Sequence, residues 1–223
     1  MRIVLAIARK DFRMELAGGG TLPAMLLFAL LVLVVFNYVL PIRSEAAAAP
    51  VLWASIVLGA LLGFSNLFLP ESEDEAASAL LMAPIDPGIV YLGKLAGAIV
   101  LLAMLEVVLV PAFVVLYRVP LDLRVARLLV PLFLGTVGVA GVGTVVSAMS
   151  QHLRGGGFLV STLALPVLVP IVVTAAAATR VLLSDEGSFS SAGVLEKIAL
   201  LAVADLLFIG ASALLYRFVL SKE

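Results

Sequence analysis

Two carboxylates inside apolar runs are the residues of this chain best placed to do chemistry. Glu106 lies in "LLAMLEVVLV" and Asp205 lies in "LAVADLLFIG". An ionisable group within a membrane helix is costly and marks, by default, a path for a proton, an ion or a polar substrate. The alternative is structural, with each carboxyl protonated or hydrogen-bonded to a neighbouring helix. Pro166 and Pro170 predict a bend in another apolar run, and bent helices can line such a path.

Two further patterns resemble binding sites but lack essential parts. Gly88–Lys94 has the glycine and lysine spacing of a nucleotide-binding loop, but Leu95 stands where Ser or Thr must bind Mg²⁺, and no strand precedes it. We therefore expect no ATPase site in this chain, and expect the Lys94 ammonium to reach lipid headgroups at the cytoplasmic end of a span. His152 is the single histidine and falls in a predicted turn, which supports neither a metal site nor a haem site.

The composition requires a membrane around most of the chain. Of 223 residues, 63% are hydrophobic and 13% are charged, and the mean hydropathy is +1.23. A soluble domain carries about 25% charged residues. The net charge of −1 provides no basic surface for nucleic acid, and the absence of cysteine excludes thiolate ligands and a cysteine nucleophile.

These values predict an all-α integral membrane protein with a single transmembrane domain, residues 1–223. A membrane-spanning helix needs about 20 predominantly apolar residues, and its backbone must satisfy its own hydrogen bonds. Six segments meet this requirement, at about 22–42, 50–69, 95–117, 128–149, 158–180 and 194–219. An even number of spans places both termini on one side, and the basic N-terminal cluster predicts that this side is cytoplasmic.

Two stretches between or before these spans predict short helices outside the membrane core. Residues 1–17 are amphipathic, and Arg9, Lys10 and Arg13 favour a helix lying on anionic lipid, with a cytosolic cap helix as the alternative. In "PESEDEAASALLMAPIDPG" a capping box predicts a helix over about 71–83. A helix this short is marginal alone in water, so it needs the membrane surface or another protein.

Small residues and one tryptophan give further expectations about packing. The fourth span contains Gly135, Gly138, Gly141 and Gly143, which predicts close approach to a neighbouring helix of the same chain. Trp53 is the single tryptophan, and we expect it at the outer membrane interface.

The order of these features resembles the haem exporter B family, the permease subunits of the cytochrome c maturation ABC complex. The resemblance covers nearly the whole chain and is carried by "ARKDFRMEL", "LLMAPIDPGIVYLGKL", "GTVGVAGVGTVVSAMS" and "LALPVLVPIVV". The wider pattern of six spans, with a helix between the second and third, is shared by ABC-2 exporters. The chain departs from the family pattern at Glu75, Ala77 and Ser78.

The resemblance implies a non-catalytic permease subunit in the inner membrane of a bacterium. It implies partners, namely a separate ABC ATPase that binds ATP-Mg, a haem-handling membrane subunit, a small single-span subunit and a second permease copy or its equivalent. ATP hydrolysis would drive haem export or release of a haem-loaded chaperone, so haem is a handled ligand. The docking residues for the ATPase would be Glu71, Glu73, Asp74, Glu75, Leu80, Leu81 and Met82.

Two other functions stay open from the sequence. One is an ABC-2 exporter for another substrate, such as a lipid or a drug. The other is a membrane-embedded enzyme or proton-coupled carrier that uses Glu106 and Asp205, although such a carrier usually has more intramembrane ionisable groups.

Overall fold

The computed structural model describes residues 21–40, 44–66, 87–120, 122–150, 156–184 and 192–220. The predicted helices over 1–17 and 71–83, with their surface and docking residues, lie outside these ranges, as does His152. The described residues form helices and no strands: α2 (Thr21–Val39), α3 (Glu45–Asn66), α6 (Pro87–Leu116), α7 (Leu123–Arg127), α8 (Leu129–Ser150), α9 (Gly156–Leu183) and α10 (Ala192–Leu220).

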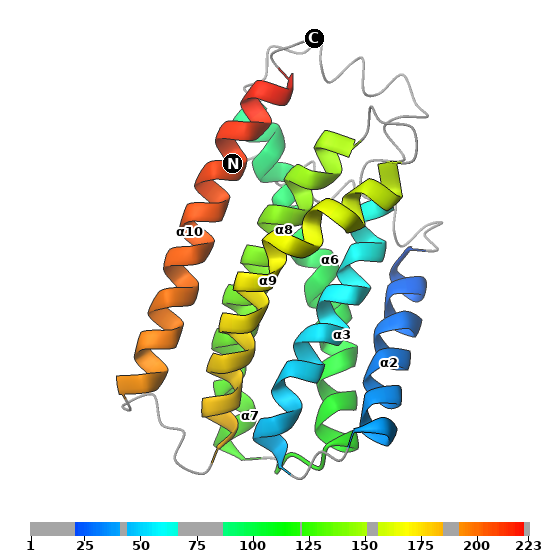
Figure 1. The fold of residues 1–223 in the computed structure, drawn as a ribbon, viewed down its shortest axis with the longest axis vertical. Coiled ribbons are helices and arrows are strands. Elements are labelled where there is room, and N and C mark those ends of the chain that lie inside the picture. The colour runs from blue at the N-terminus through cyan, green and yellow to red at the C-terminus, as the bar shows by residue number, and fades with distance from the viewer. Residues whose placement is uncertain are drawn as a thin grey trace.

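The long helices run alternately down and up along one direction (Figure 1). In that view α2, α6 and α9 descend, whereas α3, α8 and α10 ascend, and the short α7 lies at the lower end. The end of α3 at Asn66 and the start of α6 at Pro87 therefore both lie at the upper end. The segment predicted to dock a partner, 71–83, connects these two points.

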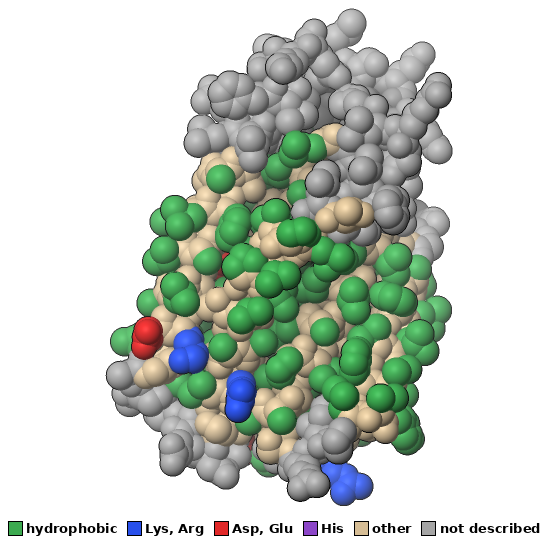
Figure 2. All heavy atoms as spheres, viewed as in Figure 1, with side chains coloured by type: hydrophobic (Ala, Val, Ile, Leu, Met, Phe, Trp, Pro, Cys, Tyr) green, Lys and Arg blue, Asp and Glu red, His purple; other side chains and the backbone are tan. Residues whose placement is uncertain are grey.

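Five of the helical segments are long and apolar enough to cross a membrane: Thr21–Val39, Ala46–Phe64, Gly88–Leu116, Val125–Met149 and Ala164–Leu183. Figure 2 shows hydrophobic side chains over most of one face, and most of the coloured charged side chains lie toward its lower end. The chain is therefore a multi-pass helical membrane protein. The 29-residue α10 is not among the five segments, and it carries Glu196, Lys197 and Asp205.

The glycines of α8 allow the neighbouring helices to come close. A Cβ at Gly135 would overlap the ring of Trp53, and a Cβ at Gly143 would overlap the ring of Phe64. At Gly141 the added atom would lie 3.1 Å from Ile209 Cγ1 of α10. The prediction of close packing within the chain is confirmed, because side chains of α3 and α10 lie against these glycines at or within contact distance of where a Cβ would stand.

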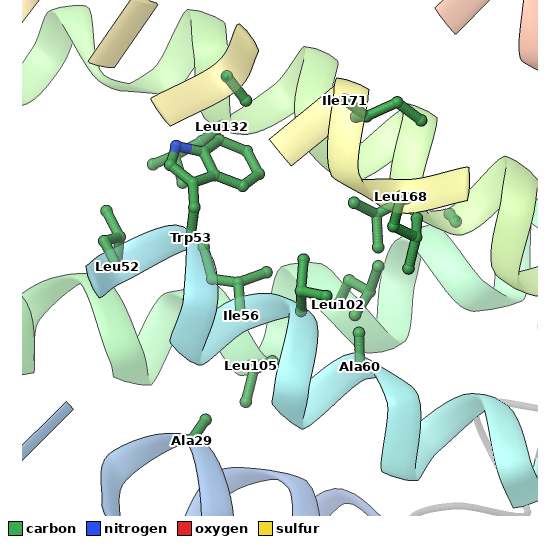
Figure 3. Close-up of a cluster of buried hydrophobic side chains, with 14 of the residues drawn as sticks. Ala29, Leu52, Trp53, Ile56, Ala60, Leu102, Leu105, Leu132, Leu168 and Ile171 are labelled. Carbon is green, nitrogen blue, oxygen red and sulfur yellow. The ribbon is translucent and has the colours of Figure 1, made fainter. Parts of the chain in front are cut away.

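Trp53 lies in the protein core and not at the membrane interface. Its side chain is fully buried, among residues of α3 and of α2, α6, α8 and α9 that include Ile56 and Leu132 (Figure 3). The indole Nε1 donates a hydrogen bond of 2.9 Å to Thr179 Oγ1 of α9. The expectation of an interfacial Trp53 is wrong, because Thr179 supplies within the protein the polar partner that an interface would otherwise offer.

The helix α9 contains both Pro166 and Pro170 without interruption. Figure 1 shows that α9 changes direction along its length, as expected where proline removes backbone hydrogen bonds. One turn later in the helix, Thr174 Oγ1 donates a 2.8 Å hydrogen bond to the carbonyl of Pro170. Both proline side chains are exposed, so they do not face the core that α9 shares with α3 and α8.

Candidate functional site in the membrane helices

Glu106 of α6 is hydrogen-bonded to the central helix α8. The carboxyl is partly buried, and its Oε1 accepts a hydrogen bond from Thr136 Oγ1. Interhelical bonds of this kind join polar groups that would otherwise face an apolar surrounding. This contact fits the structural interpretation of Glu106, in which the carboxyl joins two helices.

Asp205 of α10 is in a different situation, because nothing in the described structure bonds to it. The residue is 4% exposed, and neither carboxyl oxygen has a hydrogen-bond partner among the described residues. The carboxyl is directed at the backbone of α8, where a Cβ on Gly138 would overlap Oδ1. A polar group buried without a partner is rare and calls for a specific explanation.

The two carboxyls contact α8 on nearly opposite sides. Their neighbours on α8, Thr136 and Gly138, are two residues apart. On an α-helix this separation is about 200° of rotation and about 3 Å of rise. Glu106 and Asp205 therefore lie at similar depth but do not form a pair, and they do not converge on one shared site.

A third polar region involves the first two turns of α6. The Tyr91 side chain is fully buried, and its hydroxyl lies beside Ser212 of α10. Lys94 is only 1% exposed, so the expectation that its ammonium reaches lipid headgroups is wrong. The reason is that α6 begins at Pro87, about two turns before Lys94, and the surrounding chain covers the lysine.

Two further hydrogen bonds join neighbouring helices, one between α8 and α3 and one between α2 and α6. Ser147 Oγ of α8 donates a 2.8 Å hydrogen bond to the carbonyl of Phe64 in α3. Asn37 Nδ2 of α2 donates a 3.1 Å bond to the carbonyl of Leu116 at the end of α6. Of these residues, Ser147 could be found from the sequence, because it continues the row of small residues in α8. The contact between Asn37 and Leu116 could not be predicted, because the spacing of residues in the sequence does not show which helices are neighbours.

The polar residues of the described helices are dispersed and do not gather in one cluster. No group of three or more Asp, Glu or His side chains there could hold a metal ion. The predicted docking residues between 71 and 82 and the basic residues Arg9, Lys10 and Arg13 lie outside the described ranges, so their roles stay predictions.

The fold and these contacts define the class as a multi-pass α-helical membrane protein with two carboxyls that contact α8 at separate points. The family model described as "CcmB protein" matches residues 2–216, and the chain belongs to this family.

Several relatives carry the name heme exporter protein B, including the following three. That of Paracoccus denitrificans is 31% identical over 179 residues, which are 78% of this chain and 81% of the relative. That of Rhodobacter capsulatus is 29% identical over 178 residues, with the same two shares of 78% and 81%. That of Bradyrhizobium diazoefficiens is 24% identical over 195 residues, 86% of this chain and 87% of the relative.

Proposed function

We propose that this chain is the transmembrane permease subunit of an ATP-driven ABC complex in cytochrome c biogenesis. The observation that carries the proposal is the family match over residues 2–216, which includes the spans and the segments that join them. The relatives' name, heme exporter protein B, supports haem as the handled ligand. In this proposal the chain itself is not an enzyme, and the nucleotide chemistry belongs to a partner.

The proposed topology has six spans and both termini in the cytoplasm of a bacterium. The sixth span is α10, whose 29 residues give a length of about 43 Å, more than the roughly 30 Å of a hydrocarbon core. Its one charge toward the centre, Asp205, is turned onto α8 and not toward lipid. The alternating directions of the helices in Figure 1 support this arrangement.

The helix proposed over 71–83 transmits ATP hydrolysis to the spans. Its acidic residues would meet basic side chains of the ATPase, and Leu80, Leu81 and Met82 would fill an apolar groove there. This segment joins α3 to α6, and both helices contact α8. Displacement of the segment would therefore act on α8, which packs on α3, α6, α7, α9 and α10.

The complex proposed around this permease contains an ABC ATPase, a haem-handling membrane subunit, a small single-span subunit and a second permease copy or its equivalent. ATP-Mg binds in the ATPase, and the cycle exports haem or releases a haem-loaded chaperone. The proposed location is the bacterial inner membrane, where residues 1–17 contact lipid.

Co-purification tests the docking step. We expect the variant Leu80→Asp/Leu81→Asp to lose the ATPase during purification from membranes, because two charges would enter an apolar contact. The variant Ser72→Asp/Ser78→Asp adds the same charge to the same segment but keeps its leucines, so it should retain the ATPase. If the leucine variant still purifies with the ATPase at the level of the unaltered chain, the docking proposal is wrong.

Complementation tests the biological role. A strain lacking the gene for this chain should lose its c-type cytochromes, measured by haem staining of membrane proteins, and the intact gene should restore them. Normal cytochromes together with increased sensitivity to a drug or altered lipid export would favour the alternative, an ABC-2 exporter of another substrate.

A further inference from the structure

The contact of Asp205 with α8 lacks the hydrogen-bond donors that an ionised carboxylate needs when it is buried. Its oxygens are buried and have no donor among the described residues. Its Oδ1 lies against the bare backbone at Gly138, and the aliphatic side chain of Ile171 from α9 approaches the same glycine, with Cγ2 3.1 Å from the position of a Cβ there. An ionised carboxylate in such surroundings carries a large desolvation cost that nothing offsets.

No described charged group offsets this cost. The helices that pack on α10 are α6, α8 and α9. From its sequence, α8 contributes no titratable side chain. The titratable residues on α6, on α9 and on α10 itself are Tyr91, Lys94 and Glu106 of α6, Arg180 of α9, and Glu196, Lys197, Tyr216 and Arg217 of α10. No described side chain among them is hydrogen-bonded to Asp205.

A bound metal ion does not explain the contact either. Hard cations take about six to eight oxygen ligands, whereas no group of three or more acidic or histidine side chains gathers among the described residues, and the glycine against which the carboxyl lies is approached by the aliphatic side chain of Ile171. A proton needs one oxygen, adds almost no volume and removes the charge. A proton on the Asp205 carboxyl therefore fits the close contact between α8 and α10.

We propose that Asp205 is a proton-binding site within the membrane and that its neutral acid form allows α10 to pack on the glycine face of α8. Gly138 positions the acid, because any side chain there would occupy the space of the carboxyl. Loss of the proton places an unpaired charge in this contact and favours a state in which α10 separates from α8 and water enters. The inference goes beyond the proposed function, since it involves neither the ATPase nor haem.

Infrared spectroscopy tests the site on the full-length chain in lipid bilayers, without any partner. The protein is made with carbon-13 in the aspartate side-chain carboxyls. Asp205 is the one aspartate within the predicted spans, so at neutral pH we expect one protonated-acid band that shifts with the label. The band should be absent in Asp205→Asn and retained in Glu106→Gln. If the labelled wild-type protein has no aspartic acid band at neutral pH, the proposal is overturned.

Thermal unfolding gives a second test that depends on the consequence of the site. The folded protein holds a proton at Asp205 that the unfolded chain releases at neutral pH, so stability should fall as pH rises. We expect the wild type to lose about 5 °C in Tm between mildly acidic and alkaline pH, with a clearly smaller loss in Asp205→Asn. The Glu106→Gln variant should still show the part of the dependence that Asp205→Asn removes, because the two carboxyls contact α8 at separate points. The same pH dependence in Asp205→Asn as in the wild type would contradict the proposal.

Discussion

Gly138→Ala is the substitution that most directly probes the contact between α8 and α10. The added methyl group would overlap Oδ1 of Asp205 and would lie 3.1 Å from Ile171 Cγ2. It has contacts on two sides, so Asp205 or the whole of α10 must move. The carboxyl has no hydrogen bonds to lose, so the cost comes from displaced packing alone.

The magnitude follows from two opposing effects. Forcing an extra carbon into a well-packed interior costs about 1–3 kcal/mol. Replacing glycine by alanine within a helix returns about 0.8 kcal/mol of backbone preference. With the middle of that range we expect a net loss of about 1.2 kcal/mol, which corresponds to a decrease in Tm of about 2–5 °C for a chain of this size.

The assay is thermal unfolding of the purified protein in lipid nanodiscs, with two comparison variants. Gly210→Ala makes the same change in α10, at a position where an added Cβ has nothing within 4 Å. It should raise Tm by about 2 °C. The double variant Gly138→Ala/Asp205→Ala removes the carboxyl that the new methyl group meets, so most of the cost of Gly138→Ala should disappear in this background.

An equal cost of Gly138→Ala with and without Asp205 would refute the reasoning. Additive effects are expected of residues that do not touch. Such a result would mean that Asp205 does not lie against Gly138, and it would also remove the structural basis for a proton site there.

Two further predictions concern the other polar contacts of the core. Thr179→Val leaves the buried Nε1 of Trp53 without an acceptor and should reduce the free energy of unfolding by about 1–3 kcal/mol, whereas Thr179→Ser should keep most of the stability. Thr136→Val removes the donor to Glu106 and should cost about 1–2 kcal/mol, but the double variant Thr136→Val/Glu106→Leu should recover most of it, because neither helix then buries an unpaired polar group. Denaturation of each purified variant in detergent measures both, and equal stability of Thr179→Val and Thr179→Ser, or no recovery in the double variant, would contradict the corresponding contact.

The helical segments could be predicted from the sequence, because an apolar run long enough to cross a bilayer must satisfy its own backbone hydrogen bonds and therefore forms a helix. Their limits were less accurate. The sequence places the third apolar segment at 95–117, whereas α6 begins at Pro87, eight residues earlier. The proline before "GIVYLGKL" was a valid start signal, since proline fits the first turn of a helix.

The helix partners could not be predicted. Spans that are hydrophobic on all sides have little periodic difference between their faces, so the sequence does not say which face meets which neighbour. Trp53 and Lys94 show the result, because rules for aromatic and basic residues near membrane surfaces assume that the side chain faces lipid. Both side chains are instead buried within the protein. The glycines of α8 were recognised, but their individual partners, including Asp205, came from the structure.

The burial of Trp53 has a practical consequence for following this protein at work. It is the single tryptophan of the chain, and its indole lies where α3, α8 and α9 meet. Its fluorescence therefore comes from one position and depends on the polarity of that junction. Any step of the transport cycle that separates these three helices will change the emission wavelength, so the unlabelled protein contains its own optical reporter of motion in its core.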